Sequence, residues 1–252
     1  MRRMASPRFG DALGHGMSDK RIDILRGIGR TGSISQAARE AAVSYKAAWQ
    51  AVATLTNLAG VPLVERAVGG AGGGGASLTA HGAQLLEMAE ALEVARRAVQ
   101  ARAGAAAGHA AARLSIRTSM RNQLPATVQA IESTGRIVRV QLSLGDAQPI
   151  AARITQESAE LLGLAEGMAA IALCKATAVR IERAAAPRRT KGNLLAGTVR
   201  GVVRGEDGDE IAMALEGGLQ LVGFAPGGSG LRTRQRVLAS VDEAAVVVAL
   251  SG

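Results

Sequence analysis

One short sequence that recurs in the C-terminal half constrains the fold of this chain more than any other feature. Residues 122–128 read NQLPATV, and residues 193–199, which begin 71 positions later, read NLLAGTV. Asn, Leu, Thr and Val align without a gap, and a recurrence at a fixed period usually means one supersecondary unit used twice. The C-terminal half is therefore predicted to be a tandem repeat.

The residues in front of the repeat differ between the two copies. Ser119 and Arg121 precede the first copy, whereas Thr190 and Gly192 stand at the matching positions of the second. Apolar and polar residues alternate over 137–144, and residues 206–209 (EDGD) are typical of a hairpin turn. Both copies are therefore predicted to be β-domains. Only the first has an arginine, Arg121, in front of the repeated sequence.

Composition limits the classes of protein to consider. The chain has 252 residues, enough for two or three small domains, and 48% apolar residues, enough for packed cores. Aromatic residues make up only 2%, which argues against binding single-stranded nucleic acid by stacking. The single Cys174 excludes an internal disulfide, and neither a bilayer-spanning apolar run nor the apolar core of a secretory signal is found. We predict a cytoplasmic protein.

The net charge of +9 favours an anionic partner or ligand, although soluble proteins from arginine-rich genomes share this balance. Residues 1–19 are predicted to be a disordered arm. Ile22, Leu25 and Ile28 then recur every three residues and predict a short helix. Residues 27–32 (GIGRTG) fit the dinucleotide pattern G-x-G-x-x-G, but neither a preceding strand nor an acid about 20 residues later supports that interpretation.

Two further helices are predicted to meet at a tight turn. Ser33 and Gln36 form a capping box, and Ser44 caps a second helix that ends near residue 59. That second helix is predicted to bury Ala48, Val52, Leu55 and Leu58, and to expose Tyr45, Lys46 and Gln50 near its N-terminus. This is the pattern of a helix-turn-helix, whose second helix enters the major groove, but an ordinary helical hairpin has the same spacing.

The following glycine-rich stretch favours the DNA-binding alternative. Residues 63–66 and the segment ending at Leu78 are predicted strands, and residues 69–75 between them contain six glycines. Such a hairpin matches the wing of a winged helix, whose bare backbone can lie against phosphates. A phosphate-binding P-loop is excluded because Ala76-Ser77 stands where Lys-Ser or Lys-Thr is required. The predicted DNA-binding residues are Ser44, Tyr45, Lys46, Gln50, Arg66, Gly72 and Gly73.

A long helix is predicted after Thr79, reaching about residue 102. The spacing of a short coiled coil, in which two chains would pair, is followed by Leu85, Met88, Leu92, Ala95 and Val99, although Ala95 is small for such a position. The same stripe could instead pack on the chain's own N-terminal domain. Residues 103–112, rich in Ala and Gly, are predicted to be a linker.

Within the first β-domain, residues 155–163 are predicted to form a short helix capped by Thr155 or Ser158. Residues 168–179 are predicted to be a buried strand interrupted by Lys175. A buried lysine is costly without a partner, and because the strand contains no acid we expect an anion beside it.

Several separated motifs resemble those of the ModE family of molybdate-responsive transcriptional regulators. Residues 32–38, 44–49, 64–70 and 78–79 resemble its N-terminal domain, and residues 119–123 (SMRNQ), 155–164 and 175–176 resemble its molbindin-like β-domains. The resemblance implies an α+β multidomain protein: a winged helix-turn-helix with a long dimerisation helix, followed by two tandem OB-like β-barrels. The implied domains are 20–102, then 113–183 and 184–252 after the linker.

The resemblance also implies an oxyanion site at a subunit interface, with molybdate, or tungstate, as the ligand. Arginine and lysine would neutralise a tetrahedral dianion, while hydroxyls and backbone N–H groups supply directional donors, without catalysis or metal ligation. The alternative is that the hydroxyls only cap a helix and that the arginine forms a surface ion pair. The residues at the family's ligand positions are Ser119, Arg121, Thr155, Ser158, Lys175 and Ala176.

The second copy is predicted to have no equivalent site, because Asp242 stands opposite Lys175. Met120 replaces the alanine usual in the family's motif, which puts the affinity in question but not the class of ligand. The resemblance implies a cytoplasmic homodimer that binds operator DNA and represses molybdate uptake genes. The alternatives are a molybdate store with a vestigial DNA-binding head and, with no supporting residue cluster, an enzyme.

Overall fold

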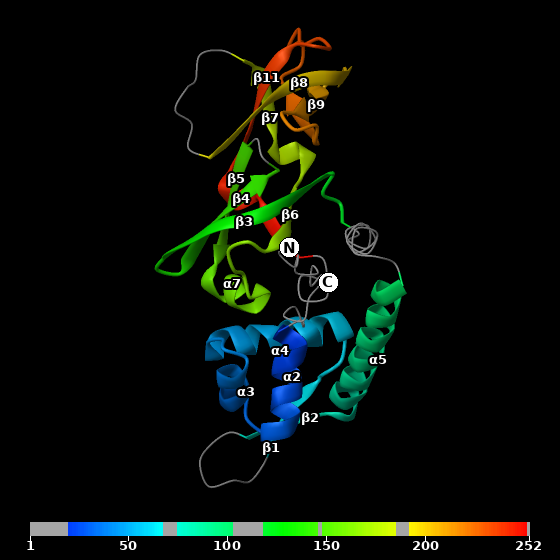
Figure 1. The fold of residues 1–252 in the computed structure, drawn as a ribbon, viewed down its shortest axis with the longest axis vertical. Coiled ribbons are helices and arrows are strands. Elements are labelled where there is room, and N and C mark those ends of the chain that lie inside the picture. The colour runs from blue at the N-terminus through cyan, green and yellow to red at the C-terminus, as the bar shows by residue number, and fades with distance from the viewer. Residues whose placement is uncertain (1–19, 68–74, 103–117, 146–147, 185–191, 251–252) are drawn as a thin grey trace, which may run out of the picture. The chain divides into compact units, whose positions relative to one another are not determined.

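The computed structural model describes residues 20–67, 75–102, 118–145, 148–184 and 192–250. The chain divides into two compact units, a helical N-terminal unit and a β-rich unit that holds most of the chain from Ile116 to Ser251. The predicted arm, the glycine run at 68–74 and the predicted linker lie outside the described residues. Most helices belong to the N-terminal unit and most strands to the second unit, as expected for an α+β protein (Figure 1).

Three short helices form the core of the N-terminal unit: α2 (Lys20–Thr31), α3 (Ile34–Glu40) and α4 (Tyr45–Ala59). The predicted caps are confirmed, since Ser33 accepts a hydrogen bond from the N–H of Gln36 and Ser44 from that of Ala47. The other half of the capping box is not formed, because the Gln36 side chain bonds to Glu40 and Arg39. Each serine caps the start of a helix, and no more than four residues separate one helix from the next.

Small side chains let these helices approach closely. Ala37, Ala38, Ala48 and Ala51 are buried together with Ile24 and Ile28. A Cβ atom on Gly27 would lie 2.9 Å from the Cβ of Ala37, so only glycine fits where α2 meets α3. Two glycines of the GIGRTG stretch, Gly27 and Gly29, thus lie inside a helix, and Gly32 follows it with a φ of +65°. The dinucleotide interpretation is thereby excluded.

The burial pattern of α4 agrees with the prediction except at its end. Ala48, Val52 and Leu55 are buried, and Tyr45 is exposed. Leu58 is 75% exposed, so its predicted inward position is wrong. It lies beyond the last turn that packs on the core, and Gly60 then ends the helix in the left-handed conformation with a φ of +70°.

An antiparallel hairpin and a long helix complete the unit. β1 (Val64–Ala67) pairs with β2 (Gly75–Leu78), joined by the glycine-rich stretch. The hydroxyl of Thr79 accepts a hydrogen bond from the N–H of Gly82, which confirms it as the cap of α5 (Ala80–Arg102). Leu85 and Leu86 pack on the unit's own core, whereas Met88 and Leu92 are exposed. The start of α5 therefore packs within the chain, and its later turns expose apolar side chains.

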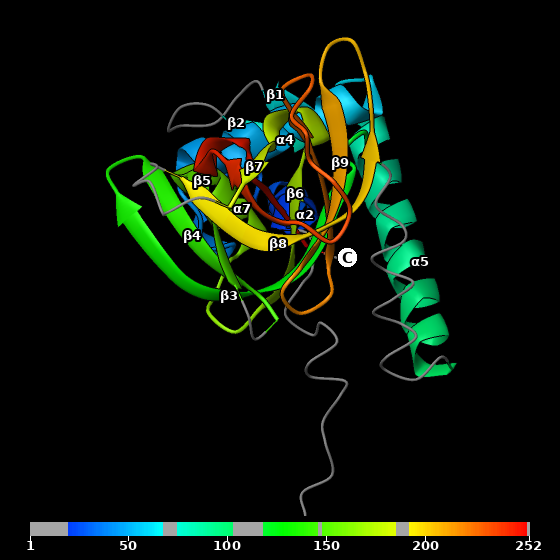
Figure 2. The same ribbon diagram turned by 90° about the horizontal axis from the view of Figure 1, so that it is seen from above.

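Apart from residues 157–163, which group with the N-terminal unit, the second unit contains the two sequence copies in equivalent order. Figure 2 shows the long bent strand β3 running through a tight turn into β4. Both copies carry a β-bulge at the same position of the repeat, between Val128 and Ala130 and between Val199 and Gly201. The first copy comprises β3 (Asn122–Thr134), β4 (Ile137–Leu144), β5 (Gln148–Thr155), α7 (Gln156–Leu162), β6 (Ala169–Cys174), the 3-10 turn η1 (Ala176–Ala178) and β7 (Arg180–Arg183). The second comprises β8 (Asn193–Val203), β9 (Asp209–Leu215), β10 (Gln220–Ala225), β11 (Arg236–Val241), η2 (Glu243–Ala245) and β12 (Val247–Ala249).

The two copies exchange their last strands. β7, at the end of the first copy, lies between β10 and β11 in a closed barrel with β8 and β9. β12, at the end of the second copy, pairs with β6 at the edge of the five-stranded sheet that contains β3, β4 and β5. The predicted domain boundary at residue 183 therefore separates the two sequence copies, but each sheet contains one strand from the other copy.

Two asparagines of the repeated sequence join the copies. The buried side chain of Asn122 donates to the carbonyl of Val222 and accepts from its N–H, both at 2.8 Å. Asn193 makes the same pair of bonds to Ala151, at 2.8 and 2.6 Å. Val222 on β10 and Ala151 on β5 are themselves equivalent positions of the repeat. The shared asparagine thus joins each copy to the other in the same way.

The predicted strand at 168–179 is wrong in its second half. β6 ends at Cys174, and Lys175 is exposed where it precedes the turn η1. No buried charge has to be compensated, because the lysine lies beyond the end of the strand. Burial of Lys175 therefore gives no reason to expect an anion beside it, and that expectation depends on the other predicted ligand residues.

Candidate functional site

The exposed face of α4 carries the residues predicted to contact DNA. Ser44 caps the helix, and Tyr45, Lys46 and Gln50 are exposed along its first two turns. Ala47, Ala48 and Ala51 hold the opposite face against the core. A well-anchored helix with a polar, exposed N-terminal end is what insertion into a major groove requires.

Sequence reasoning missed one residue of this face. Trp49 is 46% exposed, although tryptophan is usually buried, and its indole N–H donates to the hydroxyl of Tyr45 at 2.6 Å. The available signal was the spacing of four residues, which brings two side chains together on a helix.

The predicted wing is described only in part. Arg66 lies in β1, opposite Ala76 of β2, but its side chain is not described. Gly72 and Gly73 lie outside the described residues. Their contact with DNA stays a prediction.

Four of the six predicted oxyanion ligands lie at one end of the sheet. Ser119 and Arg121 directly precede β3, and Lys175 and Ala176 directly follow β6. The two strands are paired there, with Asn122 opposite Cys174. The guanidinium and the ammonium thus extend from adjacent strand ends, which is suitable for neutralising a dianion.

Thr155 lies at the other end of the same sheet, and Ser158 follows three residues later in α7. Thr155 pairs with Ile137, which in turn pairs with Thr134 at the far end of β3. Asn122 and Thr134 are the two ends of this 13-residue strand, which spans about 40 Å along its length. One chain therefore does not bring all six residues together at one point.

Arg121 is engaged in an ion pair between the copies. Its Nη1 lies 2.6 Å from a carboxylate oxygen of Glu210 on β9, and the two side chains are 54% and 29% exposed. The surface ion pair considered as the alternative is thus present. Exposed pairs contribute only about 0 to 1 kcal/mol, so an anion could displace this carboxylate. Sequence reasoning could not find Glu210, because it lies 89 residues away in the other copy.

The second copy differs at each position where the first carries a cation. Asp242 precedes η2 with nearly the same backbone angles as Lys175 before η1, and its carboxylate accepts a hydrogen bond from the N–H of Ala244. Gly192, at the position of Arg121, has a φ of +123°, which favours glycine. A Cβ atom added there would lie 3.1 Å from the carbonyl oxygen of Val241. Neither position offers a cation to an anionic ligand.

A buried carboxylate occupies the other end of the second copy. Asp209 is 1% exposed, accepts hydrogen bonds from the hydroxyl and N–H of Ser229 at 2.6 and 3.2 Å, and pairs with Arg204. The Ser229 and Arg204 bonds hold the pKa of Asp209 below its ordinary value. Ser229 lies between β10 and β11, the connection that corresponds to the one bearing Thr155 and Ser158. Here the protein's own carboxylate already uses the donors that an oxyanion would need.

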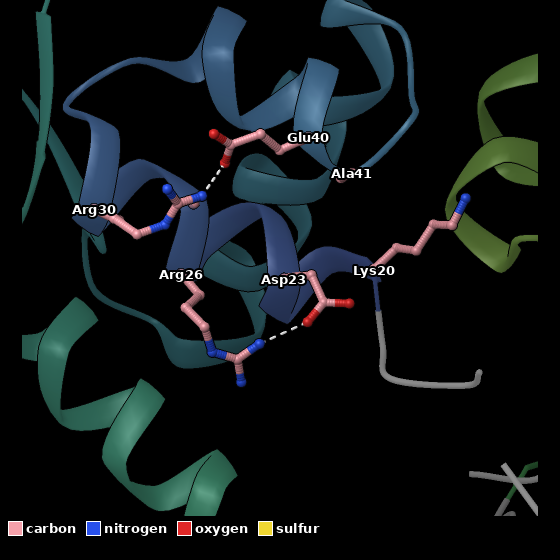
Figure 3. Close-up of a pocket in the computed structure, with 7 residues that line it drawn as sticks. Lys20, Asp23, Arg26, Arg30, Glu40 and Ala41 are labelled. Carbon is pink, nitrogen blue, oxygen red and sulfur yellow. Dashed lines mark hydrogen bonds and ion pairs between the residues drawn. The ribbon is translucent and has the colours of Figure 1, made fainter. Parts of the chain in front are cut away.

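A shallow hollow on α2 is lined by charged side chains (Figure 3). Arg26 pairs with Asp23 at 2.6 Å, and Arg30 pairs with Glu40. The arginines that line it are thus matched by carboxylates, and Gly27 is explained by its packing on Ala37. We assign this hollow no ligand.

Two further properties of the described residues bear on function. No group of three or more His, Cys, Asp or Glu side chains in that part of the chain could hold a metal ion. None of the helices described there is long and apolar enough to cross a membrane.

Comparison with known proteins connects these features. Residues 20–83 match the bacterial regulatory helix-turn-helix protein family of lysR type, and residues 118–181 match the TOBE domain. The helix-turn-helix prediction is thereby confirmed over the ordinary helical hairpin.

Relatives match across most of the chain. The DNA-binding transcriptional dual regulator ModE of Escherichia coli K12 is 34% identical over 91% of this chain and 92% of its own length. The molybdenum transport protein ModE of Azotobacter vinelandii is 36% identical over 82% and 80%. The molybdate-bound structure of the cytoplasmic molybdate-binding protein ModG matches 54% of this chain and 99% of its own, with a TM-score of 0.51 and 28% identity. This chain belongs to the ModE family of molybdate-responsive transcriptional regulators.

Proposed function

We propose that the protein is a cytoplasmic homodimer that binds molybdate in its β-domains and operator DNA through α4 and the β1–β2 wing. The observation that carries this proposal is the presence, in one chain, of an exposed helix-turn-helix face and of the family's oxyanion residues. The Escherichia coli relative, which matches 91% of this chain, is named a DNA-binding transcriptional dual regulator, and this favours a regulator over a molybdate store. No residue is assigned to catalysis.

Ser119, Arg121, Lys175 and Ala176 of one subunit would meet Thr155 and Ser158 of its partner at each anion. This division follows from the register, because the two groups lie at opposite ends of β3. Ala176 has no polar side-chain atom, so its contribution is a backbone N–H group. Tungstate, with the same shape and charge, would fit the same donors.

The exposed apolar residues of α5 would pair the subunits. Met88 and Leu92 are 55% and 63% exposed and four residues apart, and therefore lie on one face. Pairing these helices would bury both faces and hold two α4 helices at a fixed separation, as half-sites require. The two β-domains of each chain would be OB-like barrels, with the one around β8 already closed.

Bound molybdate would bias the arrangement of the two DNA-binding heads, and repression of molybdate uptake genes is the expected outcome. The first test is titration calorimetry with molybdate against sulfate. Heat with molybdate alone supports an oxyanion site selective for molybdate, and equal or absent heats contradict it.

The second test is a gel shift on palindromes upstream of candidate genes, with and without molybdate. Arg121→Ala should abolish the molybdate response and leave the dimer intact, and an unchanged response refutes the site assignment. Molybdate binding without any sequence-specific shift would instead identify a store.

A further inference from the structure

An aromatic pair stands on the exposed side of the first turns of α4. Tyr45 and Trp49 are 52% and 46% exposed and lie on the same face, with the Trp49 indole N–H donating to the Tyr45 hydroxyl at 2.6 Å. Tyrosine and tryptophan are enriched at interaction surfaces, because each combines an apolar ring with a polar group. The pair adjoins Lys46 and Gln50, the polar residues of the same face.

The hydrogen bond between Trp49 and Tyr45 determines which hydrogen bonds the Tyr45 hydroxyl can make with a further partner. An indole N–H can only donate, so the Tyr45 oxygen is the acceptor. The hydroxyl keeps its own proton available for donation to a second partner. Tyr45 is therefore prepared to meet an acceptor, and a phosphate oxygen, which at neutral pH only accepts, is the matching group.

Its position on the helix also favours a phosphate over a base. Tyr45 is the first residue of α4, directly after the cap Ser44. Helix N-termini attract phosphates through their free N–H groups, and tyrosine hydroxyls are common donors to the DNA backbone. In the proposed complex, residues further along the helix, such as Gln50, would face the bases of the major groove.

We propose that Trp49 is a positioning residue that orients the Tyr45 hydroxyl to donate a hydrogen bond to a backbone phosphate of bound DNA. This rests on the proposed DNA-binding function. Trp49 cannot withdraw into the protein, because buried Ala48 and Val52 occupy the inner face of the helix. Its indole N–H is thus held beside the Tyr45 hydroxyl.

The test is a double-mutant cycle on DNA binding. Tyr45→Phe removes only the hydroxyl, and Trp49→Phe removes the N–H donor while keeping an aromatic ring. The probe is a labelled duplex that the wild-type protein selects from a random-sequence pool, titrated by fluorescence anisotropy with saturating molybdate. Each single variant should bind about tenfold more weakly, the size expected for a hydrogen bond to a charged group.

The double variant should bind no more weakly than Tyr45→Phe, because Trp49 acts through the hydroxyl. Additive losses, or no loss in either single variant, would overturn the proposal. The loss should be equal on an unrelated duplex, since phosphates carry no sequence, and a loss confined to the selected duplex would overturn the phosphate assignment.

Two controls keep this test separate from the proposed function. If the wild-type protein selects no duplex, DNA binding itself fails, whereas a selected duplex that is insensitive to both variants refutes only the role of the aromatic pair. Trp49 is the chain's only tryptophan, so its emission should change in Tyr45→Phe without DNA, independently of any operator. Unchanged emission would contradict the hydrogen bond.

Discussion

At the residue scale, Glu210 places a negative charge where an anion has to bind. Its carboxylate is 2.6 Å from the Arg121 guanidinium and would both compete for that cation and repel a dianion. Glu210→Gln keeps the shape and removes the charge, so molybdate affinity should rise about threefold to tenfold. Titration calorimetry measures this change.

A second glutamate provides the matched control. Glu216 on the same barrel pairs with Arg236 at 2.9 Å, away from the predicted ligands. Glu216→Gln should leave the affinity unchanged. An unchanged affinity in Glu210→Gln, or an equal rise in both variants, would show that Glu210 does not compete with the ligand.

Asp209 predicts a specific acid sensitivity. Its pKa is lowered from 3.8, first by the Ser229 hydroxyl and then by Arg204. A carboxylate whose folded pKa lies below its unfolded value stabilises the fold fully above the unfolded value. That stabilisation is lost as pH falls through the folded value. Stability should therefore fall below pH 3.8, and Asp209→Asn should lower stability at pH 7 while removing this part of the dependence.

Urea unfolding of the wild-type protein and of Asp209→Asn, from about pH 5 to about pH 2.5, checks the slope. Asp242→Asn is a suitable comparison because that exposed carboxylate makes only a local hydrogen bond to Ala244. Parallel curves for the wild-type protein and Asp209→Asn would contradict the assignment.

At the scale of the elements, the two asparagines should hold the copies together. Asn122→Ala removes two hydrogen bonds and leaves the partly buried N–H and carbonyl of Val222 without these partners. Unsatisfied groups of this kind cost about 1 to 3 kcal/mol each, so a loss of about 2 to 5 kcal/mol in the free energy of unfolding is expected.

Asn193→Ala should lose a similar amount through Ala151. Denaturant unfolding measures both variants, and Gln123→Ala, at an exposed position next to Asn122, is the control. A loss no larger than that of the control would show that the asparagines do not join the copies.

Elements with local signals were the predictable ones. The caps Ser33, Ser44 and Thr79 and the strand Ile137–Leu144 follow from neighbouring residues, and the structure confirms them. The exchange of β7 and β12 could not be predicted, because strands of four and three residues have no partner specified by their own sequence. Lys175 was misjudged for a related reason, since the end of β6 depends on which strands pair with it.

The oxyanion residues were predictable as a set but not as an arrangement. Their identities came from the resemblance, whereas their separation follows from the strand register, with Arg121 and Lys175 at one end and Thr155 at the other. Glu210 became visible only through side-chain geometry, whereas the spacing of Tyr45 and Trp49 on a helix was already present in the sequence. Contacts of this kind depend on rotamers and long-range packing, which a single sequence does not encode locally.

At the scale of the whole molecule, a site shared between subunits makes a prediction about mixed dimers. Arg121→Ala damages the group at the start of β3, and Ser158→Ala damages the group at its far end. Each homodimer then has a defect in every site, so neither should bind molybdate. In a mixed dimer both defects fall in the same site, and the other site is assembled from intact residues.

Co-expression with two affinity tags isolates the mixed dimer, and calorimetry then counts the anions. Half the wild-type number should bind, at wild-type affinity, while each mutant homodimer purified in the same way serves as the control. If all six residues instead acted within one chain, every site of the mixed dimer would carry one defect and no binding would return. Because mixing repairs the site without changing any residue of either variant, a recovered half-stoichiometry can come only from residues supplied by different subunits.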